Sequence, residues 1–195
     1  PATGCAPHVN VAAVGGATAT RTVSICGPAA SMAHTMGFWQ NKNGQALIKA
    51  PATCAALRDY LRNLGTFCPY KDLSATATCA QTAGYVTNVI KAASAKGAAM
   101  NAMLKGQMLA TALSAFFTDP AHNTLNASSP LGSTTIDLTQ ICRVISSCNG
   151  NYQNVGLAFG GATSLSVGQM LTYAASQLAS ASSWYGQVKS TQELA

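Results

Sequence analysis

Acidic side chains are scarce in this chain. Of its 195 residues only five are acidic, namely Asp59, Asp72, Asp119, Asp137 and Glu193. Acid–base catalysis and the binding of Ca²⁺ or Mg²⁺ rely on carboxylates placed close together, and a glycosidase normally needs a pair of them. The scarcity argues against these functions. We therefore predict that the protein is not an enzyme and needs no cofactor.

Charge of either sign is also low. Charged residues make up 8% of the chain, against about 25% in typical soluble domains. The net charge of +6 comes from eleven Lys and Arg residues that form no basic run, a pattern that argues against nucleic-acid binding. A weakly charged surface repels other copies only weakly, which favours close packing of many subunits.

Long hydrophobic runs are missing, although hydrophobic residues make up 48% of the chain. No apolar stretch approaches the roughly 18 residues that a membrane-spanning helix requires, so we predict no membrane span. There is no phosphate-binding loop, no dinucleotide-binding fingerprint and no Gly-x-Ser-x-Gly nucleophile elbow. These absences leave no enzyme class with a positive signal in the sequence.

Cysteine, in contrast, is abundant. Scattered half-cystines are typical of an oxidising compartment, so we predict a secreted, extracellular or cell-surface protein. No Cys-x-x-Cys pair occurs, which argues against a zinc ribbon and a redox motif. The seven cysteines are Cys5, Cys26, Cys54, Cys68, Cys79, Cys142 and Cys148.

The spacing of the cysteines favours some pairings without fixing the connectivity. Cys142 and Cys148 are close enough to close a small loop, and Cys5 and Cys26 are placed to staple two strands. The remaining three compete for one further bond. Because the count is odd, either one thiol stays free or one cysteine joins two subunits, and the sequence leaves both interpretations open.

Residues 1–30 differ from the rest of the chain. Two β-prone runs flank Gly15-Gly16, which predicts a hairpin. An isolated hairpin is marginally stable in water, so we expect this N-terminal β arm to need a partner surface. That surface is either the chain's own core or a neighbouring subunit.

Residues 31–195 form the predicted helical domain. Apolar residues recur at helical spacing over 53–64 and, most strongly, over 78–118, where internal glycines allow either one helix or two. We expect a short helix over 137–147 and a final helix that begins at Ser166 and continues to about Tyr185. The predicted fold is mainly α: a disulfide-stapled bundle of about five helices with an N-terminal β arm.

The densest local motif begins at Thr35. It resembles the Thr-x-Gly-Tyr-Trp-Lys-Asn-His signature of a family of bacterial secreted and cell-surface domains of unknown function. The positions that carry the resemblance are Thr35, Gly37, Phe38 (in place of Tyr), Trp39 and Asn41, whereas Gln40 and Lys42 depart from the Lys and His of the signature. The resemblance implies export and surface placement, and it supplies no substrate.

The aromatic residues of this motif admit two interpretations. Phe38 and Trp39 bring large apolar area to a loop, so we favour a structural plug that covers neighbouring helices. The alternative is a ligand-binding platform built on Trp39.

Met32, His34 and Met36 alternate with other residues, and in an extended strand all three would point the same way. Thioether and imidazole ligands suit Cu(I), but ordinary packing is the more common use of methionine. His8 and His122 are isolated and are expected on the surface or in loops.

Three functional hypotheses remain. The leading one is a non-enzymatic extracellular structural or surface protein, a filament or sheath subunit that forms a homopolymer when its arm pairs with the next copy. The second is a secreted module that binds glycan or the cell envelope through Trp39, Trp184 and Tyr185. The third is a copper-binding protein or a hydrolase with an unrecognised triad.

Overall fold

The computed structural model describes most of the chain. The residues described are 5–14, 17–26, 33–97, 99–125, 127, 129–142, 152–179, 183–185 and 189–195. For 5–14, 17–26, 178–179, 183, 189 and 193–194 it describes the backbone alone.

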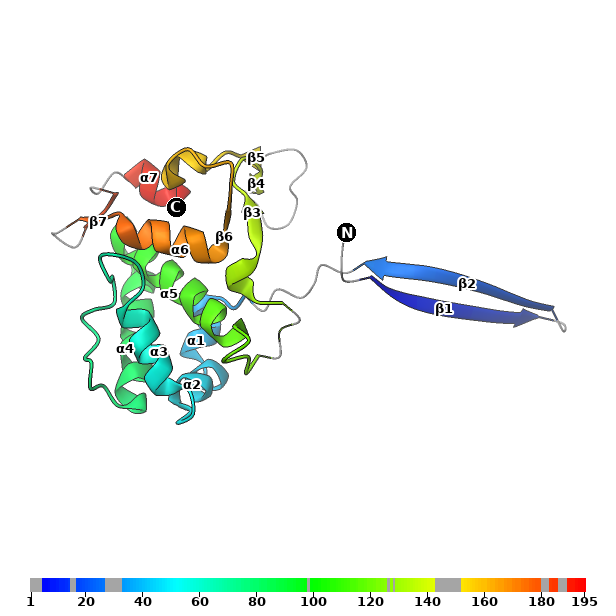
Figure 1. Ribbon diagram of the computed structural model, residues 1–195, viewed down its shortest axis with the longest axis horizontal. Helices are drawn as coiled ribbons and strands as arrows, with labels where there is room; N and C mark the ends of the chain where they lie inside the picture. Colours follow the sequence, from blue (N-terminus) through cyan, green and yellow to red (C-terminus); the bar gives the residue numbers. More distant parts are fainter. Residues whose placement is uncertain are drawn as a thin grey trace.

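The predicted mainly helical fold is confirmed. The first helices are α1 (Met36–Gln40), α2 (Lys42–Lys49), α3 (Cys54–Arg62), α4 (Cys79–Ser94) and α5 (Met100–Thr118). Helix α5 runs through the middle of the helical body, with α1 to α4 on one side of it and α6 on the other (Figure 1). The last ten residues of α5 are almost all buried, so this helix is the centre of the core.

The periodic stretch over 78–118 forms two helices. Helix α4 begins with a capping box in which the side chains of Thr78 and Gln81 each bond to the other residue's backbone. The two helices pack closely, because a Cβ added at Gly106 would lie only 2.5 Å from the Cβ of Ala93. Glycine at this crossing therefore lets the backbones approach.

The remainder of the chain consists of short elements around one more substantial helix. They are η1 (Leu131–Ser133), β3 (Thr135–Asp137), β4 (Ile141–Cys142), β5 (Tyr152–Gln153), η2 (Gly156–Phe159), β6 (Ser164–Ser166), α6 (Val167–Ser176), β7 (Leu178–Ala179), β8 (Ser183–Trp184) and α7 (Lys189–Leu194). Three antiparallel pairs join β3 to β6, β4 to β5 and β7 to β8.

The helix expected over 137–147 is not formed. Its first residues belong to strands: Asp137 pairs with Ser164, and the next backbone N–H, that of Leu138, donates to Thr163 at 2.8 Å. Leu138 is fully buried. A partner about 26 residues further along the chain thus overrides the local helical pattern, and 143–147 lie outside the described residues.

Ser166 caps the final helix as predicted, in a capping box with Gln169, and the helix begins at Val167, but it is shorter than expected. It ends at Ser176, and the chain turns into the β7–β8 pair. The indole Nε1–H of Trp184 donates to the carbonyl of Ala174 at 2.8 Å. A continued helix would use that carbonyl for the N–H four residues on, so the buried indole takes the place of the next helical bond.

The N-terminal strands pair with each other. Strand β1 (Cys5–Val14) and strand β2 (Ala17–Cys26) are antiparallel, with Cys5 opposite Cys26. Figure 1 draws them as a two-stranded ribbon.

The described cysteines resolve part of the disulfide prediction. Cys54 and Cys79 are bonded, which ties the start of α3 to the start of α4. Cys68 is free and partly exposed. Cys142 is disulfide-bonded, and Cys148, its predicted partner, lies outside the described residues. None of the described helices has the length and apolarity that crossing a membrane would demand.

Candidate functional site

The signature motif forms a closed aromatic cluster. Trp39 is completely buried and stacks on Phe117 of α5, with ring centroids 5.4 Å apart. The imidazole of His34 stacks on Phe38 at 3.6 Å, and both rings meet Trp39 edge-on. The backbone N–H of His34 donates to the Ser114 hydroxyl of α5 at 3.0 Å. This cluster joins α1 to the centre of the core.

The polar residues of the motif shape the backbone around Trp39. The side chain of Asn41 accepts hydrogen bonds from the N–H groups of Asn43 and Gly44 and so caps α2. A Cβ at Gly44 would lie 2.4 Å from the carbonyl oxygen of Phe38. These contacts fit the structural-plug interpretation.

The tryptophans proposed for glycan binding do not face solvent. Trp39 is 0% exposed and Trp184 is 1% exposed, and Tyr185 is half-buried with its hydroxyl enclosed. A stacking platform must present a ring face to the ligand. The platform assigned to Trp39 and Trp184 is therefore wrong, and any glycan-binding function would have to use other residues.

The proposed copper ligands are engaged in packing where they are described. The sulfur of Met36 lies against Gly106, 2.9 Å from where a Cβ would sit, and the His34 ring lies on Phe38. Met32 lies outside the described residues. Within the part of the chain that is described, no three His, Cys, Asp or Glu side chains gather as a metal site.

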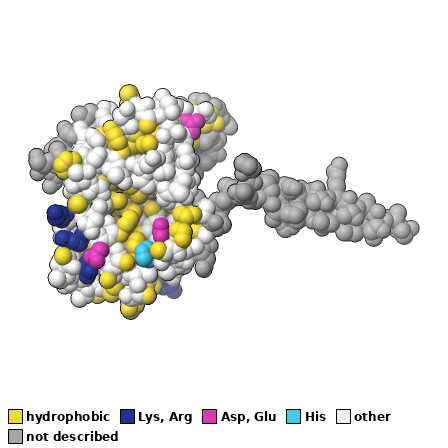
Figure 2. Space-filling view, viewed as in Figure 1, with side chains coloured by type: hydrophobic (Ala, Val, Ile, Leu, Met, Phe, Trp, Pro, Cys, Tyr) yellow, Lys and Arg dark blue, Asp and Glu magenta, His cyan; other side chains and the backbone are white. Residues whose placement is uncertain are grey.

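A different part of the molecule forms an open cleft. It lies between α3, the C-terminal end of α5 and α6, and has a volume of about 630 Å³. The side chains that give it chemical character are Asp59, Tyr60, Asn63, Phe116, Asp119, His122 and Thr172. Figure 2 shows a histidine next to an acidic side chain on one face, with exposed hydrophobic side chains nearby.

Aromatic rings form one wall of this cleft. The imidazole of His122 stacks on Phe116, with centroids 4.3 Å apart and planes 17° apart. Tyr60 of α3 leans on the same phenylalanine at 5.3 Å. Three rings from separate elements therefore form a continuous aromatic surface.

The turn after α5 positions the imidazole. Asp119 ends the helix, and its side chain accepts from the N–H of Ala121 at 2.9 Å, while its carbonyl accepts from the N–H of His122 at 2.8 Å. Further along, the N–H of Leu131 donates to the buried Thr118 hydroxyl at 2.9 Å. The loop is thus fastened at both ends.

Two of the five acidic residues of the chain line this cleft. Asp59 pairs with Arg58 at 2.8 Å, and the hydrogen bond from Arg58 holds the pKa of Asp59 below its ordinary value. Asp119 makes no ion pair with any described residue. Burial raises the pKa of Tyr60 to about 12, and the negative charge of Asp119 acts in the same direction.

The cleft continues along α6. A second hollow of about 690 Å³ shares Gly168 and Thr172 with the first and extends to Leu165 and Tyr173. Its lining is mostly apolar or small. The two hollows adjoin at these residues, and together they are called the groove, with an acidic, aromatic end and a more apolar end.

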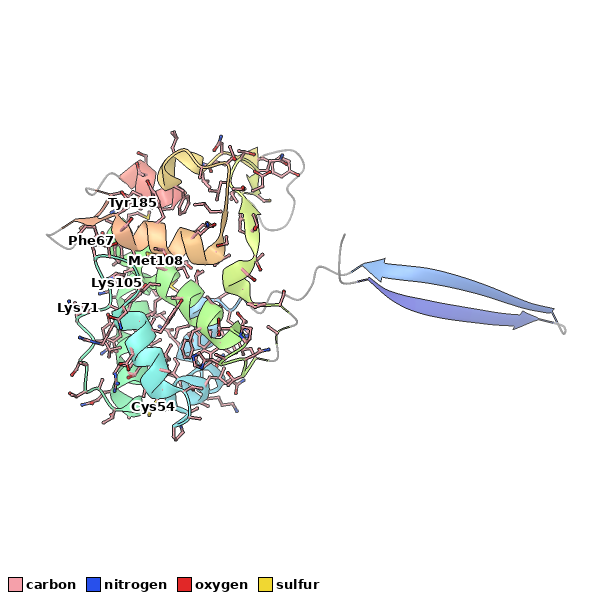
Figure 3. The ribbon with its side chains drawn as sticks, in the orientation of Figure 1. Cys54, Phe67, Lys71, Lys105, Met108 and Tyr185 are labelled. Carbon is pink, nitrogen blue, oxygen red and sulfur yellow. A yellow bond between two sulfur atoms is a disulfide. The ribbon has the colours of Figure 1, made fainter. Side chains whose placement is uncertain are left out.

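An acidic group elsewhere in the molecule is neutralised. Asp72 accepts hydrogen bonds from the Tyr85 hydroxyl at 2.6 Å and from the Lys105 ammonium at 3.1 Å. Figure 3 shows Lys105 on the same side of the body as Lys71, far from Cys54. The Lys105 ammonium thus accompanies Asp72, whereas Asp119 has no cationic partner among the residues that the structure describes.

The sequence did not point to the cleft. The sequence places His122 on the surface or in a loop, and Phe116 falls within the periodic apolar stretch over 78–118 without being singled out. The one local signal was the helix-ending Asp119-Pro120 pair, which brings a histidine back towards the helix it follows.

The chain was compared with protein-family models, curated proteins and solved structures, and no match was found. What the cleft can do must therefore be argued from its residues. A free carboxylate beside aromatic rings is suited to a cationic group, because the charge and the ring faces both attract it.

Proposed function

We propose that this protein is an extracellular structural subunit that assembles with copies of itself through its N-terminal hairpin. The observation that carries the proposal is the pairing of β1 and β2 with each other and with no third strand among the described residues. Hairpins of this kind are marginally stable alone and gain stability when another strand or surface covers them.

The two edges of the hairpin differ in their fitness for pairing. Strand β1 contains Pro7, which cannot donate a backbone hydrogen bond. Strand β2 contains neither proline nor lysine, the residues that commonly protect an edge. The β2 edge is therefore the one we expect to meet the neighbouring subunit.

The rest of the chain is consistent with this role. The weakly charged surface favours dense packing of subunits, and the Cys54–Cys79 bond fits an oxidising, extracellular setting. The partly exposed Cys68 leaves open the hypothesis that a disulfide also joins subunits. Separation of the native protein on a non-reducing gel tests that hypothesis.

The main test is deletion of residues 1–27. Electron microscopy and analytical ultracentrifugation of the unreduced full-length protein should show regular polymers, and the truncated protein should remain monomeric with an unchanged helical circular dichroism spectrum. A Val11→Pro variant, which breaks the hairpin without shortening the chain, should behave like the deletion. Polymers that persist after the deletion would refute the proposal.

A further inference from the structure

We infer that the acidic end of the groove receives Arg21 from the hairpin of a second copy. This inference rests on the proposed function, and it names the surface of the neighbour on which the hairpin docks. The occupant of the cleft is then the protein's own β2 strand.

Charge complementarity is the first argument. Arg21 is the only Lys, Arg, Asp or Glu among residues 1–41, and it lies opposite Asn10 in the hairpin. Asp119 lines the cleft and has no cationic partner among the described residues. In a chain with so few charges, a lone cation on the hairpin and an uncompensated carboxylate in the cleft form a specific pair.

The chemistry of the cleft wall is the second argument. A guanidinium group is planar, stacks on aromatic rings and bonds to carboxylates through two parallel N–H groups. The cleft presents the His122 and Tyr60 rings, which both contact the buried Phe116 ring, together with Asp119. An arginine side chain is therefore a better fit than a lysine ammonium.

The shape of the groove is the third argument. Strand β2 has ten residues and is about 33 Å long, whereas α6 spans about 15 Å. A strand laid along α6 would therefore contact this helix over about half of the strand's length. At this end η1 and α6 lie in close contact, because a Cβ added at Gly168 would sit 3.1 Å from the carbonyl oxygen of Gly132.

A charge exchange in the full-length protein tests the inference. Arg21→Glu and Asp119→Arg should each raise the concentration needed for assembly at least tenfold, because each places like charges together. The double variant should return to within about threefold of the wild type. Asp137→Arg is the matched control: this exposed carboxylate also lacks a described cationic partner but lies outside the cleft, and it should leave assembly unchanged.

Two results would overturn the inference. One is a double variant that assembles no better than the single variants; the other is an Asp137→Arg effect as large as that of Asp119→Arg. If deletion of residues 1–27 abolishes assembly while every cleft variant assembles normally, the hairpin function stands and only the docking site is wrong. A wild-type protein that stays monomeric refutes both.

Cross-linking provides a direct second measurement. In an Arg21→Lys variant, a carbodiimide should join Lys at position 21 to Asp119 by an amide bond with loss of water. Mixing isotope-labelled and unlabelled protein identifies links between chains. Links to other carboxylates alone, or links within one chain, would contradict docking of a second copy.

Discussion

Adjacent residues on α5 take part in two aromatic clusters with opposite characters. Phe117 stacks on Trp39 in a closed cluster that includes the His34–Phe38 stack. Phe116 contacts the rings of His122 and Tyr60 at an open cleft, and these three rings are called the open cluster. Both contain an imidazole stacked on a phenylalanine, but only the open one also has a carboxylate that meets no cationic group in the described part of the chain.

The comparison separates residues that shape the fold from residues available to a ligand. Three residues of the closed cluster, His34, Phe38 and Trp39, lie within six positions of one another and so form a visible motif. The open cluster combines Phe116 and His122, which are six positions apart, with Tyr60 from a distant part of the chain, and it forms no recognisable motif. In this chain the densest motif marks a structural element, and the accessible chemistry lies elsewhere.

Removing the centre of the closed cluster should have the largest effect on stability. Trp39→Ala should lower the free energy of unfolding by about 3–5 kcal/mol, because it leaves a cavity against Phe117. Trp39→Phe should cost much less, since the indole N–H has no hydrogen-bond partner among the described residues. Denaturant unfolding measures both; equal losses would show that the ring is not packed as described.

Backbone crowding beside the same tryptophan gives the next largest effect. Gly44→Ala should destabilise by about 1–3 kcal/mol, because the new Cβ would meet the Phe38 carbonyl and the Trp39 Cα. Gly84→Ala in α4 is the control: nothing lies within 4 Å of its added Cβ, so it should stabilise by up to about 1 kcal/mol. If both substitutions stabilised the protein, the close approach of Gly44 to the backbone of Phe38 and Trp39 would be contradicted.

Local signals predicted much of the helical part of the fold. The caps of α4 and α6 follow from Thr78 and Ser166 with a glutamine three residues later, and these contacts need no distant partner. The strands β3 and β4 were missed because their partners come later in the chain. The early end of α6 was missed because Trp184 returns to its last turn.

The candidate site was hidden for a related reason. No property of Phe116 alone indicates that its buried ring is covered by His122 and Tyr60 at a cleft, while the ring of the next residue packs on Trp39. The cleft depends on the tertiary contact of α3, α5 and α6, and on a turn that carries His122 back over α5. Sequence reasoning found the charge shortage, but it could not place the few charges in space.

The contribution of the open cluster to stability should depend on alkaline pH and that of the closed cluster should not, because only the open cluster contains a tyrosine. Tyr60 has a pKa of about 12 in the folded protein against 10.0 for the free side chain, so the folded state keeps a proton that the unfolded chain releases. Its contribution to stability is complete below pH 10 and is lost as the pH rises towards 12.

Unfolding measured between pH 9 and 12 tests this dependence. The free energy of unfolding of the Tyr60→Phe variant should fall less steeply with pH than that of the wild type. The Tyr152→Phe variant, changed at an exposed tyrosine, should show the same pH dependence as the wild type. Identical slopes for all three proteins would mean that Tyr60 is not buried against Phe116.

The smallest expected effect is a shift in the titration of Tyr60 when its neighbouring charge is removed. Asp119→Asn should lower the pKa of Tyr60, because the negative charge of Asp119 adds to the effect of burial in keeping the hydroxyl protonated. The absorbance difference between each protein and its Tyr60→Phe counterpart isolates this titration, and Asp137→Asn provides the control. A shift confined to Asp119→Asn would place an ionised carboxylate beside the aromatic wall, which is the condition that the docking of Arg21 requires. An unchanged pKa of Tyr60 would show that Asp119 does not lie beside the aromatic wall. The open cluster would then have no carboxylate there to attract Arg21, and in this respect it would resemble the closed cluster.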